Sequence, residues 1–223
     1  MIICSSATGK VHETELRIMR PTVEAYAKKY NMDTIFFKER FDSSRPASWD
    51  KIIILYNLLK NYDRVMWIDS DAIFLDTRLD IRTELDEDHV MFMVTHYGRS
   101  PIWPNAGLIV AKKDEKTFDL LNKIWNETDA INHPWWEQQA FFSVLGYENS
   151  YHHIIAYHPN QYSNLIGSLD LKWNSRPIDG DISEDPMIMH YGGLPHEKRI
   201  SGMAACYRIF KIRTRRDKYR RKN

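Results

Sequence analysis

The sequence predicts an α/β domain in which helices flank a mainly parallel central sheet. Three observations favour this fold class. Short apolar segments with the composition of strands alternate along the chain with longer segments of helical periodicity, which is typical of a layered α/β domain. The 223 residues, 43% of them apolar, suffice for one sizeable domain with its own core. The sequence contains no internal repeat, low-complexity segment or long linker.

The segments predicted to form strands are short apolar runs bounded by polar or turn-forming residues. In chain order they are residues 1–5, 33–38, 64–68, 89–96, 106–112, 152–159 and 186–191. The RVMWI run at 64–68 ends directly before Asp69, and Asp71 follows two residues later. Because ligands of open α/β sheets bind beyond the carboxyl ends of strands, these two carboxylates lie where a binding site is expected.

The segments predicted to form helices repeat apolar residues every three or four positions. In chain order they are residues 13–31, 49–62, 115–127 and 137–146. We expect Pro21 to start or kink the first helix, Ser48 to cap the second, and Gly146 to close the fourth.

Cysteine content and apolar runs predict the compartment. Cys4 and Cys206 are the only cysteines, which is too few for a disulfide framework and predicts a reducing compartment. No apolar run reaches the roughly 18 residues of a transmembrane helix, and the N-terminal MIICSSATGK lacks the charged region of a signal peptide. Seven Trp and twelve Tyr indicate either an aromatic core or side chains that stack on flat ligands such as bases and sugars.

Basic residues concentrate at the C-terminus. Residues 208–223 carry nine Lys or Arg and one Asp, a net charge of +8, and the rest of the chain has 22 basic and 29 acidic residues, a net charge of −7. Apolar residues at 203, 207 and 210 recur at near-helical spacing. We therefore expect a domain of residues 1–200 and a basic C-terminal helix or tail of residues 201–223. That segment is expected either to contact an anionic membrane surface or to be a solvated tail.

Asp69 and Asp71 form a D-x-D motif at the end of an apolar strand. Neighbouring carboxylates at the edge of a core repel each other and need a cation or hydrogen-bond donors to stay ionised. Hard oxygen ligands suit Mn²⁺ or Mg²⁺, and an ion held by carboxylates on one side can hold a diphosphate on the other. The alternative is a strand-end turn in which both side chains cap backbone N–H groups.

The segment PASWDKIIILYNLLKNYDRVMWIDSDAIF, residues 46–74, resembles the signature of nucleotide-sugar glycosyltransferases of the GT-A fold. It is most similar to the galactosyl/mannosyl/xylosyltransferase family (GT34-like), which includes the yeast α-1,2-galactosyltransferase and the plant xyloglucan xylosyltransferases. In that family W-x-K and W-x-D-x-D-A are followed by N-x-G-x-x-x-x-(R/K), W-(D/E)-Q-x-A and M-x-H-(F/Y)-x-G, and the matches cover residues 1 to about 200. The later matching positions are Asn105, Gly107, Lys112, Trp136, Glu137, Gln138, Ala140, Met189, His190, Tyr191 and Gly193.

The resemblance implies a GT-A fold with a Rossmann-like sheet and a metal-dependent glycosyltransferase. Asp69, Asp71 and His190 are implied to hold Mn²⁺, or Mg²⁺, with the diphosphate of a nucleotide sugar; an O,O,N donor set fits Mn²⁺. Glu137 and Gln138 are implied to be catalytic, below the transferred sugar and the acceptor hydroxyl. For Glu137 the alternative is that it only starts a helix, where the macrodipole favours an acid.

The resemblance also implies donor-binding residues around the metal and at the exit of the first strand. They are Cys4, Ser5, Ser6, Trp49, Lys51, Asp69, Ser70, Asn105, Gly107, Gly193, His196 and Lys198. Trp49 and Lys51 are expected to line the donor pocket, and Asn105 to bond the donor sugar or position Glu137. Many GT-A enzymes have a phosphate-binding Lys six residues after the metal-ligating His. His196 occupies that position here and Lys198 follows, so both stay candidates.

The expected reaction moves a hexosyl or pentosyl group from a UDP-sugar to a glycan or lipid-linked acceptor, with retention, as in the family. An inverting enzyme would need a carboxylate base, which Glu137 could supply. Eukaryotic relatives carry an N-terminal membrane anchor, whereas strand-forming residues begin at residue 2 here. We therefore expect a cytoplasmic enzyme of bacterial or viral origin, peripheral to the inner face of the membrane.

Two alternatives come from other classes of protein. A haloacid-dehalogenase-type phosphatase also has D-x-D after an apolar strand, and GDISED at 180–185 matches its later G-D-x-x-x-D. Against it, about 65 residues precede the motif, and Ala72 and Ile73 replace the usual Thr or Val. A nucleic-acid-binding module could use the basic tail with its interleaved aromatics. No known nucleic-acid motif is present and the body is acidic, so no nucleic-acid partner is expected.

Overall fold

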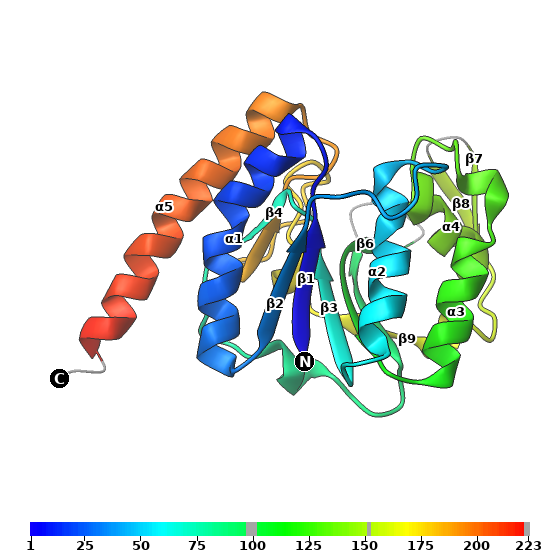
Figure 1. The fold of residues 1–223 in the computed structure, drawn as a ribbon, viewed down its shortest axis with the longest axis horizontal. Coiled ribbons are helices and arrows are strands. Elements are labelled where there is room, and N and C mark those ends of the chain that lie inside the picture. The colour runs from blue at the N-terminus through cyan, green and yellow to red at the C-terminus, as the bar shows by residue number, and fades with distance from the viewer. Residues whose placement is uncertain (97–101, 151–152, 221–223) are drawn as a thin grey trace.

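A six-stranded sheet forms the centre of the protein (Figure 1). The structure is a computed structural model that describes residues 1–96, 102–150 and 153–220, with side chains as far as residue 214 in the last helix. The strand order is β2-β1-β3-β6-β5-β9, and of these six strands β6 runs antiparallel to the rest. The strands are β1 (Ile2–Ser6), β2 (Asp33–Phe37), β3 (Arg64–Ile68), β5 (Met91–His96), β6 (Trp103–Lys112) and β9 (Ile166–Leu169). The predicted α/β class with a mainly parallel sheet is confirmed.

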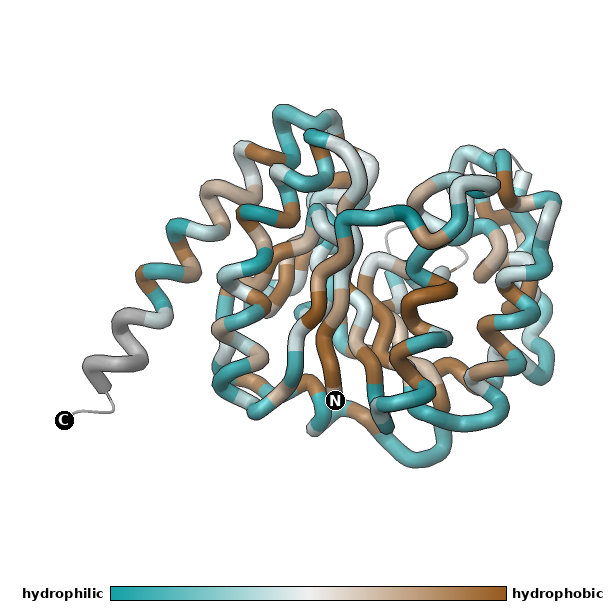
Figure 2. Tube along the Cα trace, in the orientation of Figure 1, coloured by the Kyte–Doolittle hydropathy of each residue, from teal (hydrophilic) through white to brown (hydrophobic). Residues whose placement is uncertain are grey.

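Helices cover both faces of this sheet. Side chains alternate along β3, so Met66 and Ile68 join the core on one face, and Val65 and Trp67 join the core on the other. The first core is covered by α1 (Lys10–Tyr30) and α5 (His196–Arg220). The second is covered by α2 (Asp50–Leu59), α3 (Glu115–Trp125) and α4 (Trp136–Leu145). Figure 2 shows the resulting pattern, with apolar central strands and polar residues along the outer sides of the helices.

The expected cap at Ser48 and the expected start at Pro21 are wrong, the end at Gly146 is confirmed, and a kink at Pro21 stays a prediction. Ser48 does not cap α2, because residues 47–49 form the 3₁₀ turn η1 (Ala47–Trp49) and the helix begins at Asp50 with no side-chain cap. Pro21 does not start α1, which begins at Lys10 and continues through the proline. Burial of the apolar side chains on both sides of Pro21 outweighs the one hydrogen bond that the proline cannot donate. Gly146 closes α4 in the left-handed conformation, with a φ of 85°.

Two small antiparallel sheets and four further 3₁₀ turns complete the described fold. The small sheets are β4 (Ala72–Phe74) with β10 (Ile188–His190), and β7 (Tyr147–Ser150) with β8 (His153–Tyr157). The turns are η2 (Ile81–Glu84), η3 (Thr128–Ala130), η4 (Ser163–Leu165) and η5 (Leu171–Trp173). Strands β4, β7 and β9 were not predicted, because runs this short become strands only when a distant partner pairs with them.

The C-terminal helix α5 begins at His196 and runs beside α1 before diverging from it toward the C-terminus (Figure 1). Met203 and Phe210 are buried in the core that α1 and β4 share, and Tyr207 packs against it. The three apolar positions that suggested a membrane-facing stripe are therefore covered by the protein itself. None of the described helices combines the length and the apolar character needed to cross a membrane.

Candidate active site

An open cavity of about 680 Å³ lies where the strands β1 and β3 end. Ser6 marks the end of β1, and Asp69, Ser70 and Asp71 follow β3; all four line the cavity. The cavity therefore occupies the edge of the sheet that the α/β fold class predicts for a binding site.

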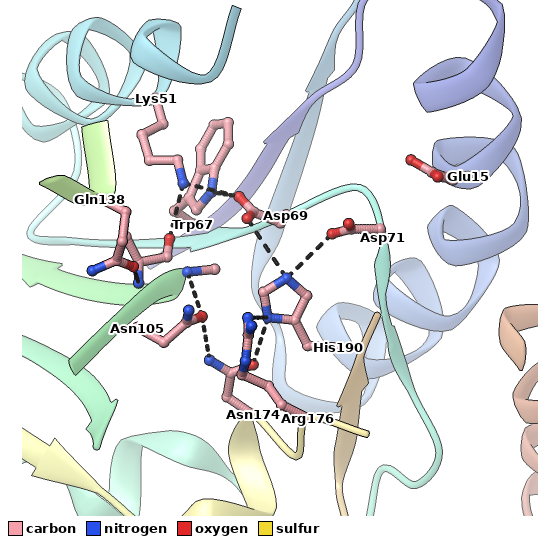
Figure 3. Close-up of polar contacts among 12 residues, drawn as sticks. Glu15, Lys51, Trp67, Asp69, Asp71, Asn105, Gln138, Asn174, Arg176 and His190 are labelled. Atoms are coloured by element: carbon pink, nitrogen blue, oxygen red, sulfur yellow. Dashed lines mark hydrogen bonds and ion pairs between the residues drawn. The ribbon is translucent and has the colours of Figure 1, made fainter. Parts of the chain in front are cut away.

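Asp69, Asp71 and His190 form a cluster in this cavity (Figure 3). Each offers a ligand atom, and these atoms lie within 4.8 Å of one another. His190 Nε2 is 3.3 Å from Asp71 Oδ1 and 3.8 Å from Asp69 Oδ2. The antiparallel pairing of β4 with β10 sets His190 opposite Ala72, which brings the imidazole beside Asp71. Two carboxylates and one imidazole fit Mn²⁺ or Mg²⁺.

The imidazole of His190 is oriented by buried polar neighbours. Its Nδ1 lies 2.9 Å from Asn174 Oδ1, and Asn174 Nδ2 donates to Asn105 Oδ1 at 2.9 Å. With Nδ1 bonded to Asn174, Nε2 is the ring nitrogen that faces the two carboxylates, as a metal-ligating His requires. A Cβ atom at position 107 would come within 2.1 Å of His190 Cε1, so only glycine leaves room for the ring.

Asn105 lines the cavity, so its predicted contact with the donor sugar stays a prediction. Its side-chain oxygen accepts from Asn174 and from the backbone N–H of Gly107 at 3.0 Å, so it supports the orientation of His190. No contact between Asn105 and Glu137 is present among the described hydrogen bonds. Arg176 also lines the cavity, with Nη1 3.5 Å from His190 Nδ1. The sequence did not predict Asn174 or Arg176 as site residues, because both lie in an irregular segment without a recognisable motif.

Lys51 connects the D-x-D motif with Glu137, and Figure 3 shows its contact with Asp69. Its side chain is only 2% exposed, and Nζ lies 3.1 Å from Asp69 Oδ1 and 2.7 Å from Glu137 Oε1. Trp67 Nε1 also donates to Asp69 Oδ1, at 2.6 Å. Burial alone would lower the pKa of Lys51, but the charges of Asp69 and Glu137 outweigh burial and raise this pKa above its usual range.

Asp71 has separate partners on the other side of the motif. Arg199 Nη1 donates to Asp71 Oδ2 at 3.3 Å, and His190 faces Oδ1. Burial alone would raise the pKa of Asp71, but its hydrogen bond with His190 and the charges of His190 and Arg199 lower it instead. The two carboxylates of the D-x-D motif are thus each compensated by their own cation and donors.

Glu15 holds Arg199 in place from helix α1. The Glu15 side chain is fully buried, with Oε1 2.9 Å from Arg199 Nε and Oε2 2.9 Å from His12 Nδ1. Both His12 and Arg199 line the cavity. The bond to Glu15 raises the pKa of His12 above its usual value, although burial opposes this. None of these three residues was among the predicted site residues.

The phosphate-clamp candidates His196 and Lys198 do not line the cavity, whereas Arg199 does. His196 Nδ1 instead lies 3.6 Å from Glu15 Oε1, and Lys198 is exposed. The reason is the register of α5: residue 199 is on the same helical face as the buried Met203 and Phe210, and residue 198 is not. The spacing of these apolar residues was the signal that could have identified Arg199.

Three further predicted donor-binding residues lie away from the cavity surface. Cys4 and Ser5 are fully buried in β1, and their side chains are covered by the neighbouring strands and helices. Trp49 does not line the cavity, because its indole is buried edge-to-face against Trp125 in the core under α2. The predicted residues that do line the cavity are Ser6, Lys51, Asp69, Ser70, Asp71, Asn105, Gly107, Glu137, Gln138, His190 and Gly193.

Glu137 and Gln138 differ in how much of each side chain is engaged. Gln138 Oε1 accepts from the Ala106 N–H at 2.7 Å and its Nε2 donates to the Pro104 carbonyl at 3.0 Å, so the amide is tied to β6 at both ends. Glu137 Oε1 pairs with Lys51, but its Oε2 is buried and has no hydrogen-bond partner among the described residues. Glu137 thus retains one carboxylate oxygen for a ligand.

Comparisons with known proteins agree with this site. Residues 12–198 match the family model described as nucleotide-diphospho-sugar transferase. A glycosyltransferase involved in the glycosylation of the major capsid of PBCV-1 has a similar structure, with a TM-score of 0.64 at 15% identity over 92% of this chain and 100% of that chain. An active-site mutant of LgtC has a TM-score of 0.51 at 12% identity, over 92% of this chain and 95% of that chain. Mouse xyloside xylosyltransferase 1 has a TM-score of 0.51 at 11% identity, over 87% of this chain and 100% of that chain. No curated protein matches the sequence.

The fold and the position of the D-x-D cluster define a nucleotide-sugar glycosyltransferase of the GT-A fold. Because the matching model spans most of its length, the chain belongs to the nucleotide-diphospho-sugar transferase family. The resemblance noted in the sequence is therefore confirmed. The match includes both the D-x-D motif and the 180–185 segment, so the phosphatase alternative loses the two observations that suggested it. The nucleic-acid alternative receives no support from the comparisons.

Proposed function

We propose that the protein transfers a hexosyl or pentosyl group from a UDP-sugar to a hydroxyl of a glycan or lipid-linked acceptor, with retention and with Mn²⁺ preferred over Mg²⁺. The observation that carries the proposal is the Asp69/Asp71/His190 cluster, which offers two oxygens and one nitrogen within 4.8 Å at the end of β3. A bound divalent ion there would neutralise charge on the departing nucleotide diphosphate.

The chain's own cations support binding of a diphosphate in the cavity. Arg199 lies beside Asp71 and is held by Glu15, so its guanidinium is already oriented toward the carboxylate cluster. A planar guanidinium binds phosphate oxygens in a fixed geometry. We therefore assign the phosphate contact to Arg199 in place of His196 or Lys198.

Glu137 and Gln138 are proposed to act at the sugar. Glu137 Oε2 is a buried acceptor without a partner in the described chain, and a hydroxyl of the donor or acceptor sugar would supply the missing donor. Gln138 is held rigidly by β6 and shapes the cavity floor next to it. Groups that act at the reacting centre contribute in the transition state, so Glu137→Ala and Gln138→Ala should lower kcat more than they raise donor KM.

Retention, the choice of UDP, a cytoplasmic location and peripheral contact with an anionic membrane remain predictions. For the membrane contact, the buried positions of Met203 and Phe210 leave the basic residues of α5 as its only proposed basis.

The test is a donor screen. The purified protein is incubated with a panel of nucleotide sugars and Mn²⁺, and the released nucleoside diphosphate is measured. We expect release from at least one UDP-sugar, weaker release with Mg²⁺ and none in excess EDTA. Full turnover in EDTA would contradict the metal assignment, and release from GDP-sugars alone would contradict the choice of UDP. Hydrolysis of p-nitrophenyl phosphate without any nucleotide-sugar turnover would contradict the proposed function.

A further inference from the structure

The cavity has two chemically different ends. One end is formed by residues that follow β1 and by the segment before α2, including Ser6, Ala7 and Ala47. The opposite end is lined by large apolar side chains: Trp103, Trp135, Trp136, Phe142 and Ile154. In the sheet, β3 lies between β1 and β6, so the D-x-D cluster at the end of β3 separates the two ends. The proposed donor needs the first end and the metal cluster, which leaves the aromatic end without a ligand.

The aromatic end is a continuous wall that starts at the candidate metal site. The Arg176 guanidinium lies 3.5 Å from His190 Nδ1 and 5.8 Å above the ring centre of Trp103. Trp103 then packs edge-to-face on Phe142 with 5.8 Å between ring centres, and Phe142 packs edge-to-face on Trp135 with 5.6 Å between ring centres. A molecule seated along this wall would therefore have one end close to the metal cluster.

Trp136 stands at the rim of this wall in an unfavourable backbone conformation. Its φ is +45°, and among the described residues only Asn31, at the left-handed end of α1, is another non-glycine residue with positive φ. Its indole is 48% exposed, so it contributes little to the core. The turn at the first residue of α4 places Glu137 beside Lys51, and glycine or asparagine would make that turn at a lower cost. An exposed indole at such a position indicates that the side chain itself has a use.

We propose that Trp136 and the adjoining aromatic wall bind the acceptor, and that the acceptor is a saccharide whose apolar ring face stacks on the Trp136 indole. This inference rests on the proposed glycosyl transfer. Polar groups share this end of the cavity with the aromatics, namely Asp179, His153 and the free oxygen of Glu137. A cavity end that combines indole side chains with hydrogen-bonding groups suits a sugar ring, which has an apolar face and hydroxyl edges, better than an alkyl chain.

The experiment compares Trp136→Gly and Trp136→Phe with Phe41→Ala. Phe41 is a matched control because it is an aromatic residue of similar exposure, 42%, and does not line the cavity. The probes are p-nitrophenyl α- and β-glycosides of glucose, galactose, mannose and xylose, offered with the donor found in the screen. We expect Trp136→Gly to raise the acceptor KM, or to lower the ratio of transfer to donor hydrolysis, about tenfold. Trp136→Phe should lie between this variant and wild type, and Phe41→Ala should match wild type.

Two further readouts separate binding from folding. Glycine tolerates the left-handed turn, so Trp136→Gly should unfold at the same temperature as wild type or higher. Saturation-transfer NMR with the same glycosides should show contact with wild type and loss of contact in Trp136→Gly. This binding measurement needs no turnover, so glycoside binding without any nucleotide-sugar hydrolysis would count against the proposed function and not against the acceptor site.

Several outcomes would overturn the inference. One is an unchanged acceptor KM and unchanged NMR contact in Trp136→Gly. Another is a rise in donor KM alone, which would mean that the indole stacks on the nucleotide base. A third is that no glycoside contacts the wild-type protein while alkyl-chain acceptors bind in a Trp136-dependent manner, which would assign the wall to a lipid.

Discussion

Two ion-pair networks flank the D-x-D motif, and they differ in depth and in origin. The inner network consists of Lys51, Asp69 and Glu137, which come from α2, the end of β3 and α4 on one face of the sheet. The outer network consists of Asp71, Arg199, Glu15 and His12, and it depends on α5 docking against α1 on the other face. The inner cation is almost fully buried, whereas the outer network opens to the cavity through the half-exposed His12.

The difference explains how two carboxylates coexist at the end of an apolar strand. Each carboxylate has partners of its own, Lys51 and Trp67 for Asp69 and Arg199 for Asp71, and His190 lies beside both. The protein therefore neutralises the motif by itself. We expect loss of the inner cation Lys51 to act mainly on stability, and changes of Asp71 and Arg199 in the outer network to act mainly on ligand binding. The following predictions test this division, from the largest expected effect to the smallest.

Asp71→Asn should abolish turnover, because it removes a charged ligand from the proposed metal site. We expect kcat/KM to fall by about a thousandfold or more, equivalent to roughly 4 kcal/mol of transition-state stabilisation. The rise in melting temperature on adding Mn²⁺ should also disappear. Asp88→Asn, an exposed carboxylate outside the cavity, is the control and should behave as wild type. Retained Mn²⁺-dependent turnover in Asp71→Asn would rule out Asp71 as a ligand.

Lys51→Met should be the most destabilising single change in the inner network. It leaves the buried carboxylate of Glu137 and the partly exposed Asp69 without their cation. Breaking a buried ion pair on one side costs about 3–5 kcal/mol, which urea denaturation can measure. Adding Glu137→Gln to Lys51→Met should recover part of the loss, because the second change removes the uncompensated charge. A loss below about 1 kcal/mol for the single variant would show that Lys51 does not stabilise the fold.

Arg199→Ala and Lys198→Ala should differ although they are neighbours. Arg199→Ala removes the cation between two buried carboxylates and should destabilise the protein by about 1–3 kcal/mol while raising the donor KM. Lys198 is exposed, so Lys198→Ala should stay within about 0.5 kcal/mol of wild type and leave donor KM unchanged. Denaturation curves and donor kinetics of both variants are the measurement. The reverse ranking of donor KM values would assign the phosphate contact to Lys198.

The smallest expected effect is a pH dependence of stability from His12. Its pKa is raised in the folded protein by Glu15, so its stabilising contribution is complete below the unfolded value near 6.5. The contribution is lost as the pH rises through the raised folded pKa. Because the side chain is 48% exposed, solvent screening should keep it below about 1 kcal/mol. Wild type should therefore lose more stability than His12→Gln between pH 6 and 9; equal losses would mean that the His12–Glu15 pair contributes nothing measurable.

The local sequence was enough to predict most of the sheet and to single out the three residues of the inner network, but not the ion pairs between them. The strand at 64–68 is a continuous apolar run, and such a composition predicts burial on both faces of the sheet. Lys51, Asp69 and Glu137 belong to motifs that occur in a recognisable order along the chain. His190 was also identified, because its motif is equally compact. These features depend on residues close together in the chain, where periodicity and motif spacing carry the information.

The sequence by itself thus determined the α/β class, the D-x-D chemistry and the elements that carry Lys51, Glu137 and His190. Only the tertiary structure decided which side chains complete the site. Trp49 packs in the core, and Asn105 accepts a hydrogen bond from Asn174, the residue that orients His190. Arg199 lines the cavity, whereas His196 and Lys198 do not. The physical reason is that these choices depend on how helices and short strands distant in the chain pack together. The apolar spacing at 203 and 210 indicates which face of α5 is buried, but local periodicity does not show that this face packs on α1 or that β4 pairs with β10, and these two contacts set the direction of each side chain.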